Sequence, residues 1–455
     1  MNRKNMRFKK TLILLSTLTL LFAVIVGWQS RSPLFYWGRP YLSAFLSLLC
    51  FFFAVLWFFK RTLYSGKAKR RVTALSFLFV MASGVPVARE MLFSSKKQSV
   101  LHADPLQLQK WGRHLMIGFE NWEDVEPLVA RGALGGLFIT RRNVAGFSFE
   151  EVKGKIAHLQ TLQEAQGLPP LWIATDQEGG LISKLSPLLT PLPPLAKVVR
   201  ENPEEESLKR AVTRYASLQA EELARLGVNV NFSPVVDLKN PAPVSFPDAH
   251  SLIRERAISE DPRVVEEVAA LYCETFEKHG VIPTLKHFPG MAGVTTDTHL
   301  YEGSLSQSRE ELESKDWLPF RKTLEESSAF LMLGHVRVPS VDRDYPASLS
   351  KKTIQEIVRG EWHHDGILIT DDLCMGPTFS WPGGIGASAV TALNAGVDLL
   401  LVAYDGEQYY EVMEALLRAE GKGKMDSGLI SRSIERLNRV SPLKVSLREQ
   451  RNMLQ

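Results

Sequence analysis

The sequence is poor in cysteine and has no strong charge imbalance. It contains three cysteines in 455 residues and no CxxC pair, so we predict neither a disulfide framework nor a metal site, and no cofactor is expected. The formal net charge is only +4, and basic clusters near the N-terminus account for part of it, so the charge does not indicate a nucleic-acid partner. What remains is a globular chain of ordinary composition, except at its N-terminus.

The first hundred residues contain three uncharged hydrophobic stretches, at residues 11–28, 41–59 and 72–88. Each has about the length of 17 to 25 residues that a helix needs to cross a bilayer. The first stretch lacks a small-x-small cleavage signal before Arg31, and two more hydrophobic stretches follow it. An uncleaved membrane anchor is therefore expected rather than a secretory signal peptide.

The placement of lysine and arginine predicts how the anchor is oriented. Only Arg31 and Arg39 lie between the first two stretches, whereas basic residues are frequent before the first stretch and between the second and third: Arg3, Lys4, Arg7, Lys9, Lys10, Lys60, Arg61, Lys67, Lys69, Arg70 and Arg71. Because basic loops stay in the cytoplasm, the remainder of the chain is expected on the non-cytoplasmic side of the bacterial inner membrane. If the third stretch, with Gly84 and Pro86, did not cross, the large domain would be cytoplasmic.

Beyond about residue 105, short apolar runs alternate with longer helical patterns, which is typical of repeated β-α units. The predicted strands are residues 114–118, 135–139, 171–175, 228–232, 281–285, 329–333, 366–370 and 397–402. Eight strands are the number that closes a (β/α)8 barrel. We therefore predict an α/β chain: a TIM-type barrel at residues 101–445, preceded by a helical transmembrane region at 1–100 and followed by a tail at 446–455.

Polar residues follow four of these predicted strands, directly or after one glycine. They are Asp176, the pair Lys286 and His287, His335, and the pair Asp371 and Asp372. Active sites of such barrels are built at the carboxyl ends of the strands. These side chains are therefore expected to converge on one mouth of the barrel.

Asp371 is the first candidate for chemistry, because it emerges from a rigid apolar strand. A carboxylate there can attack an anomeric carbon and form a covalent glycosyl-enzyme, which water then hydrolyses with retention of configuration. The alternative is that Asp371 or Asp372 caps the next helix.

A retaining glycosidase also needs a proton donor, and Asp297 and His299 could supply one. An aspartate two residues before a histidine can orient its imidazole and stabilise the charged form, although a purely structural contact is the more common reason for such a pair. Lys286, His287 and Asp176 are candidates for hydrogen bonds to sugar hydroxyls. Arg256 either binds substrate or secures its loop through an ion pair.

Several motifs together resemble glycoside hydrolase family 3, in its bacterial β-N-acetylhexosaminidase branch, over most of residues 105 to 440. In chain order they are Asp176-Gln177-Glu178-Gly179-Gly180, Asn231-Phe232-Ser233-Pro234-Val235-Val236-Asp237, Lys286-His287-Phe288-Pro289-Gly290 with Asp297-Thr298-His299, and Thr370-Asp371-Asp372-Leu373-Cys374-Met375. The lysine motif followed by Asp-x-His distinguishes this branch from relatives that use a carboxylic acid as proton donor.

The resemblance implies roles and a substrate. Asp371 matches the family's nucleophile, His299 its general acid/base and Asp297 the partner of that histidine. The residues that match its sugar-binding set are Asp176, Arg256, Lys286 and His287. Lys184 is assigned to the same set, although the family has an arginine at that position. The implied substrate is N-acetylglucosamine β-linked to muramic-type sugars in peptidoglycan fragments.

The chain departs from the family pattern at two places within these motifs, and its membrane segment is foreign to the soluble members. Leu181 and Lys184 stand where the family has arginines, and Lys184 keeps a charge but lacks the planar guanidinium. Met291 and Ala292 replace the usual His-Gly. A phosphorylase or a β-glycosidase for another sugar on the same fold, and a membrane protein that binds the cell wall without turnover, remain as alternatives.

Overall fold

The computed structural model describes residues 3–240 and 251–440. The chain divides into two compact units, Met1–His102 and Ala103–Gln455. The regular elements described in the first unit are all helices, and we call the second the barrel unit. The C-terminal tail predicted at residues 446–455 lies outside the described residues.

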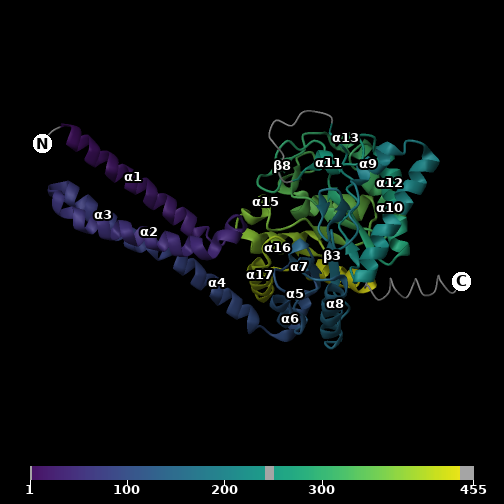
Figure 1. Cartoon of the computed structure of the whole chain (residues 1–455), viewed down its shortest axis with the longest axis horizontal. Coiled ribbons are helices and arrows are strands. Elements are labelled where there is room, and N and C mark those ends of the chain that lie inside the picture. The colour runs from purple at the N-terminus through teal and green to yellow at the C-terminus, as the bar shows by residue number, and fades with distance from the viewer. Residues whose placement is uncertain (1–2, 241–250, 441–455) are drawn as a thin grey trace. The chain divides into compact units, whose positions relative to one another are not determined.

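The first unit is a bundle of long helices: α1 (Arg3–Trp28), α2 (Arg39–Lys60), α3 (Gly66–Ser83) and α4 (Val85–Leu101). Figure 1 shows α1, α2 and α3 running alongside one another. Polar side chains join the helices inside the bundle, as Trp57 Nε1 donates to Ser16 Oγ (3.1 Å). Three helical stretches, Thr11–Trp28, Pro33–Leu63 and Gly66–Leu101, are long and apolar enough to cross a membrane. They coincide with the three hydrophobic stretches of the sequence.

The barrel unit is built on eight parallel strands that form a nearly closed barrel. The strands are β1 (Leu115–Gly118), β2 (Gly136–Phe138), β3 (Trp172–Thr175), β6 (Val230–Asn231), β7 (Ile282–Phe288), β9 (Phe330–Leu333), β12 (Leu368–Thr370) and β13 (Leu400–Val402). They pair in chain order, and β13 returns to β1. The gap between β12 and β13 is joined by a single parallel bridge between Ile369 and Leu399. All eight predicted strands are confirmed.

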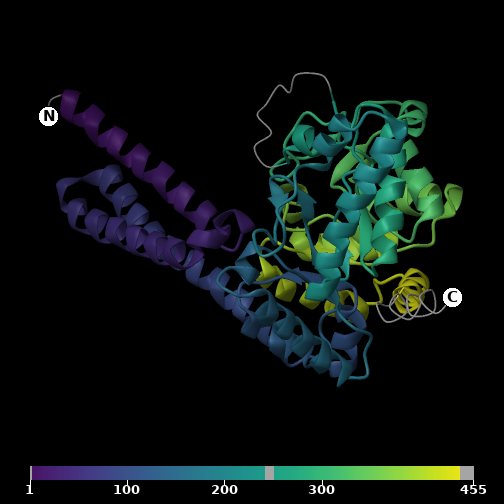
Figure 2. The same cartoon turned by 45° about the vertical axis from the view of Figure 1, so that its right-hand side comes forward.

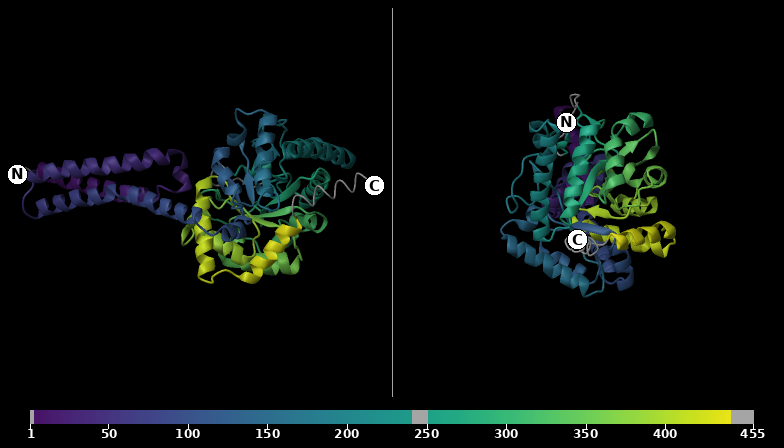
Figure 3. Two further views of the ribbon diagram at one scale, coloured as in Figure 1. Left: turned by 90° about the horizontal axis from the view of Figure 1, so that it is seen from below. Right: turned by 90° about the vertical axis from the view of Figure 1, so that its right-hand side faces the viewer.

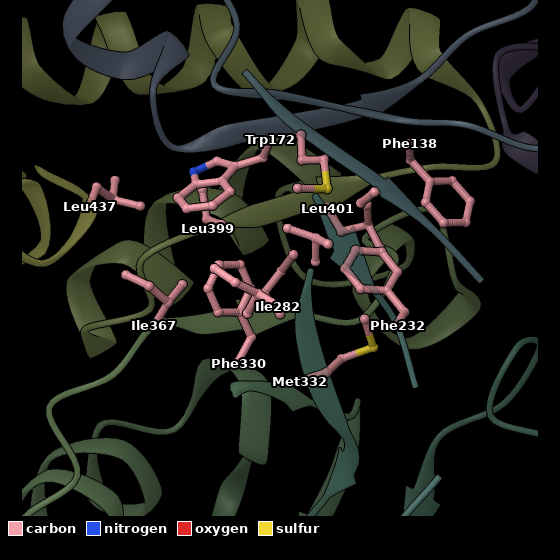
Figure 4. Packing of buried hydrophobic residues seen from close by; sticks show 14 residues of the cluster. Phe138, Trp172, Phe232, Ile282, Phe330, Met332, Ile367, Leu399, Leu401 and Leu437 are labelled. Carbon is pink, nitrogen blue, oxygen red and sulfur yellow. The ribbon is translucent and has the colours of Figure 1, made fainter. Parts of the chain in front are cut away.

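The interior of the barrel is filled by side chains from every strand. Figure 4 shows Trp172, Ile282 and Phe330 packed together, with Phe138 and Phe232 beside them. The Phe138 and Phe232 rings stack with centroids 5.5 Å apart, and Trp172 meets Phe330 edge to face at 5.3 Å. Alternate residues of each strand face the surrounding helices. Both faces of the sheet are therefore buried, which explains why the strands read as continuous apolar runs.

Helices surround the strands, as Figures 2 and 3 show. The longer ones are α8 (Phe149–Glu164), α10 (Glu205–Leu226), α12 (Pro262–Lys278), α14 (Leu318–Glu326), η4 (Lys352–Glu361), α16 (Gly384–Ala395), α17 (Tyr409–Gly421) and α18 (Ser427–Arg439). Helix α12 begins as its sequence predicts: Asp261 caps it by accepting the N–H of Arg263 (2.8 Å), and Pro262 occupies the first turn.

Two small sheets extend the loops at the carboxyl ends of the strands. In the loop after β3, β4 (Gln177–Gly179) pairs antiparallel with β5 (Ile182–Ser183). A three-stranded sheet combines β8 (Gly303–Ser304) from the loop after β7 with β10 (Val336–Val338) and β11 (Asp342–Pro346) from the loop after β9. These sheets add backbone hydrogen bonds to the loops at the mouth of the barrel.

Candidate active site

A buried group of alternating charges lies at the carboxyl ends of β3 and β7. Lys286 Nζ is 2.6 Å from Asp176 Oδ1 and 2.6 Å from Glu178 Oε1. Arg256 donates two hydrogen bonds to the same Glu178, from Nε to Oε2 (2.9 Å) and from Nη2 to Oε1 (2.7 Å). Burial alone would raise the pKa of Glu178, but the charges of Arg256 and Lys286 lower it to about 2. Glu178 therefore stays ionised at neutral pH, and the carboxylate of Asp176 remains partly accessible.

Arg256 thus has the ion pair that one interpretation of the sequence expected. Burial alone would lower its pKa, but the carboxylate of Glu178 outweighs burial and raises it. The guanidinium also donates to the carbonyl of Ser251 (2.7 Å), and its Nη2 lies 3.5 Å from His287 Nε2. Its side chain therefore connects its own loop to two neighbouring strand ends.

The fully buried carboxylate of Asp237 orients the imidazole of His287. Its Nδ1 lies 2.7 Å from Asp237 Oδ2, and its backbone N–H donates to both oxygens of Asp237 at 3.1 Å. Since Asp237 can only accept when ionised, Nδ1 carries the proton and Nε2 faces Arg256. The pair fixes both the ring position and its tautomer.

Asp371 lies directly beyond β12, with its N–H bonded to the carbonyl of Leu333 on β9 (2.9 Å). Burial alone would raise the pKa of its carboxyl group. Nearby His287, His335 and His299, together with the N–H of Asp372 on Oδ1 (2.8 Å), outweigh burial and lower this pKa. Asp371 is therefore a carboxylate at neutral pH, which is the state that a nucleophile needs.

Asp372 has a different environment, and this separates the two adjacent aspartates. Its carboxylate accepts the backbone N–H groups of Cys374 (3.0 Å), Ala403 (2.9 Å) and Tyr404 (2.8 Å). His335 Nε2 lies 3.0 Å from its carbonyl oxygen. Asp372 therefore binds the backbone of two loops, whereas Asp371 accepts one backbone N–H from its neighbour. The helix-cap alternative for Asp371 finds no support here, because the helix that follows, α15 (Gly376–Phe379), begins after Met375.

Asp297 and His299 form the expected contact on the loop after β7. His299 Nδ1 lies 3.1 Å from Asp297 Oδ1, and the backbone N–H of His299 donates to the same oxygen (3.0 Å). The Asp297 side chain is 9% exposed and the imidazole 41%. A buried carboxylate thus holds a partly exposed imidazole through Nδ1.

The loop that carries His299 is fixed across the mouth. The carbonyl of His299 accepts the N–H of Gly376 (2.8 Å), which lies beyond Asp371 on the loop after β12. Beyond His299, β8 pairs with β10 in the register Gly303 with Val336. The structure therefore brings Asp371, Asp297, His299, Lys286 and His287 to one end of the barrel, together with Asp176 and Arg256.

The residues that depart from the family pattern, Leu181, Lys184, Met291 and Ala292, lie on two loops at the mouth of the barrel. Lys184 follows β5, and its backbone N–H donates to the carbonyl of Asp176 (3.0 Å), which places it beside the charged group. Leu181, at the tip of the same hairpin, is 68% exposed. Met291 is buried, and the carbonyl of Ala292 accepts a hydrogen bond from the side chain of Asn240. Met291 and Ala292 are therefore part of a packed loop.

Some residues of the site were not singled out from the sequence. Glu178 and Asp237 lie inside motifs that were recognised, but nothing in the sequence shows that they pair with Arg256 and His287. Asp316 was missed entirely: it is buried near Gly290, and burial, followed by the charge of Asp237, raises its pKa to about 6. Its sequence neighbourhood carries no signal that separates it from a surface aspartate.

Comparison with known proteins identifies the family. The model for the glycosyl hydrolase family 3 N-terminal domain matches residues 108–440, which is nearly the whole barrel unit. The chain belongs to glycosyl hydrolase family 3. It is 31% identical over 284 residues to a beta-hexosaminidase of Nitrosomonas eutropha, covering 62% of this chain and 77% of that protein. It is 32% identical over 316 residues to a beta-hexosaminidase of Hydrogenovibrio crunogenus, covering 66% and 82%.

Solved structures of this family have the same fold. A family 3 beta-N-acetylglucosaminidase from Paenibacillus superposes with a TM-score of 0.66 at 29% identity, covering 74% of this chain and 62% of that one. A family 3 glycosyl hydrolase from Mycobacterium smegmatis gives 0.64 at 27% identity, covering 73% and 96%. This glycoside hydrolase therefore spans less than two thirds of the Paenibacillus protein and nearly all of the mycobacterial one.

The contact between Gly376 and the His299 loop gives a first testable prediction. A Cβ added at Gly376 would lie 2.2 Å from the backbone carbonyl oxygen of Leu300, so Gly376→Ala must push the loop away. We expect kcat/KM for glycoside hydrolysis to fall about 10- to 100-fold, because a shift near 1 Å in a reacting group has effects of that size. The matched control is Gly154→Ala on α8, where the added methyl meets open space. Equal activity of both variants would contradict the close docking of this loop.

Proposed function

We propose that this family 3 enzyme is a retaining β-N-acetylhexosaminidase that releases N-acetylglucosamine from the non-reducing end of its substrate. The observation that carries the proposal is the combination of an ionised Asp371 with an accessible His299 held by Asp297 at one barrel mouth. The beta-hexosaminidase relatives and the beta-N-acetylglucosaminidase structure supply the sugar.

In the first step, a carboxylate oxygen of Asp371 attacks the anomeric carbon while the glycosidic bond breaks. His299 donates the proton on Nε2 to the departing oxygen, and Asp297 stabilises the positive imidazolium that exists before this transfer. In the second step, His299 accepts a proton from water as the water oxygen attacks the anomeric carbon. Asp371 leaves as a carboxylate, and two inversions give retention.

The remaining polar residues are proposed to bind the sugar that is released. Asp176 is partly accessible and can accept hydrogen bonds from adjacent hydroxyls, while Lys286 Nζ, 2.6 Å away, holds its carboxylate in place. His287, Lys184 and Arg256 complete the set that we assign to this sugar. The bidentate ion pair with Glu178 pre-orders Arg256, so that less conformational freedom is lost on binding.

The leaving group is proposed to be a muramic-type sugar of peptidoglycan. We expect the wild-type enzyme to hydrolyse a chromogenic β-N-acetylglucosaminide at least about 100-fold faster than the matching β-glucoside, because a site that hydrogen-bonds a substrate group discriminates strongly against the analogue that lacks it. N-acetylglucosaminyl-β-N-acetylmuramic acid should be cleaved as well.

A separate product analysis, with and without phosphate, distinguishes the alternative functions. Free N-acetylglucosamine under both conditions supports hydrolysis, whereas a sugar phosphate identifies a phosphorylase. No product at all would favour a binding protein without turnover.

We further propose that the N-terminal unit anchors the enzyme in the bacterial inner membrane, with the barrel unit on the non-cytoplasmic side. Arg31 follows the first candidate span and Glu90 the apolar part of the third, and Arg31 Nε donates to Glu90 Oε2 (2.8 Å). This ion pair places both residues at the same end of the bundle. Because Arg31 follows the first span and Glu90 follows the apolar part of the third, this position supports three crossings between the N-terminus and the barrel unit.

A reporter fusion tests this orientation. Alkaline phosphatase fused after His102 should be active, because that enzyme folds only outside the cytoplasm, while a fusion after Tyr64, in the basic second connection, should be inactive. Activity of the Tyr64 fusion alone would show that the orientation is opposite to the one proposed. Inactivity of both fusions would mean that the third stretch does not cross.

A further inference from the structure

Aromatic side chains are distributed unevenly over the surface of the barrel unit. Within its described residues, three aromatic side chains are exposed: Tyr301 (64%), Tyr345 (40%) and Tyr404 (41%). Each lies on a loop at the carboxyl end of the barrel, after β7, β9 and β13 respectively. With β12, which carries Asp371 at its end, these strands form a continuous half of the barrel.

A fourth aromatic residue joins this group from the loop after β12. Trp381 is half-buried, and its ring centroid lies 5.5 Å from that of Tyr345, with the planes inclined by 40°. It lies between α15, whose Gly376 binds the His299 carbonyl, and α16. We call Tyr301, Tyr345, Trp381 and Tyr404 the aromatic rim.

Backbone hydrogen bonds and strand pairing connect the residues of the aromatic rim to the loops of the proposed reacting groups. Tyr301 is two residues from His299, and its N–H donates to the carbonyl of Asp297 (2.9 Å). Tyr404 donates its N–H to Asp372, next to the nucleophile. Tyr345 is on β11, in the same small sheet as β8, the strand that follows the His299 loop. The rim therefore lies on, or is hydrogen-bonded to, the loops that carry His299 and Asp371, while the charged group around Lys286 lies at the ends of β3 and β7.

We propose that the aromatic rim binds the leaving-group sugar, with Trp381 and Tyr345 as the stacking surface. The proton donor must lie against the departing oxygen, so the side of the mouth next to His299 is where the leaving group has to be. A pyranose ring has a rigid apolar C–H face, and flat Tyr and Trp rings offer large apolar area with a polar edge at little loss of conformational freedom. The proposal rests on the proposed function and specifies which half of its substrate these residues recognise.

The test compares two substrates that share the released N-acetylglucosamine and an alkoxide leaving group. One is a disaccharide with a second N-acetylhexosamine, and the other is methyl β-N-acetylglucosaminide, which has no second ring. In the full-length protein, Trp381→Ala and Tyr345→Ala should each lower the ratio of kcat/KM for disaccharide over methyl glycoside about 10-fold, as expected for the loss of one aromatic stacking contact. Trp381→Phe should restore most of the ratio. Leu181→Ala removes an exposed apolar side chain at the same mouth but outside the rim, and should leave the ratio unchanged.

The outcomes separate this proposal from the function on which it rests. An unchanged ratio in an active Trp381→Ala or Tyr345→Ala enzyme would overturn the role of the aromatic rim alone. If the tryptophan variant does not fold, the exposed Tyr345 decides the question. A wild-type enzyme that releases no N-acetylglucosamine from either compound or from a chromogenic glycoside would overturn the proposed function, and the rim assignment with it.

Discussion

Asp371→Asn is expected to lower kcat for a chromogenic β-N-acetylglucosaminide by at least about 10⁴-fold, the scale seen when a covalent nucleophile is removed. Asparagine has the same shape and can still accept the N–H of Asp372 through its oxygen. It has no charge with which to attack the anomeric carbon. The loss should therefore appear in turnover and not in folding.

The measurement is steady-state kinetics with thermal unfolding of the same samples. The unfolding midpoint should stay within a few degrees of the wild type, which corresponds to about 1 kcal/mol or less. Asp426→Asn is the matched control: Asp426 caps α18 by accepting the N–H of Leu429 (3.1 Å), and asparagine caps about as well. That variant should keep full activity. Near wild-type turnover in folded Asp371→Asn would remove Asp371 from the mechanism.

His299→Ala is expected to slow hydrolysis of natural disaccharides by about 10²- to 10⁴-fold, the usual contribution of a general acid. Sugars are poor leaving groups and need a proton as the bond breaks. Aryl glycosides with acidic phenols need less help, so their glycosylation step should suffer less. Asp297→Ala should show the same selectivity in milder form, because the imidazole would remain but lose its orienting partner.

The comparison uses kcat/KM for a series of aryl glycosides of falling phenol pKa together with a disaccharide. His158→Ala serves as control, since His158 is exposed on α8 and pairs with Glu126 on the outside of the barrel unit. It should leave all rates unchanged. Equal losses on good and poor leaving groups in folded His299→Ala would exclude direct proton donation and indicate a binding or loop-ordering role.

The barrel could be predicted from the sequence because its signals are local. Each strand is an apolar run, and a polar residue directly after a parallel strand must lie at its carboxyl end, so the positions of Asp176 and Asp371 followed from the strands alone. Several boundaries were wrong: β12 and β13 begin later than expected, at Leu368 and Leu400. The largest extension is in β7, which was expected to end at residue 285 but continues through Lys286 and His287 to Phe288. The ladder with β9 shifts register there and resumes at Phe288 opposite Leu333.

The partners of these residues could not be predicted, because they depend on contacts between distant loops. Glu178 is 78 positions from Arg256 in the sequence, and Asp237 is 50 positions from His287. A single sequence also does not show that Gly376 lies against the His299 loop, because a glycine before a proline is equally typical of an ordinary turn. The same limit applies to Trp381 and Tyr345, whose rings meet only when two loops fold over the mouth.

Covalent trapping tests the central claim of this account most directly. The wild-type enzyme is incubated with an activated fluorosugar analogue of N-acetylglucosamine, digested, and its peptides are sequenced by mass spectrometry. Slow turnover of the fluorosugar should leave the glycosyl group as an ester on Asp371, in the peptide that contains Thr370 to Met375, and Asp371→Asn should remain unlabelled. A label on Asp372 would move the nucleophile by one residue. Inactivation without any carboxylate ester in that peptide would contradict the proposed mechanism.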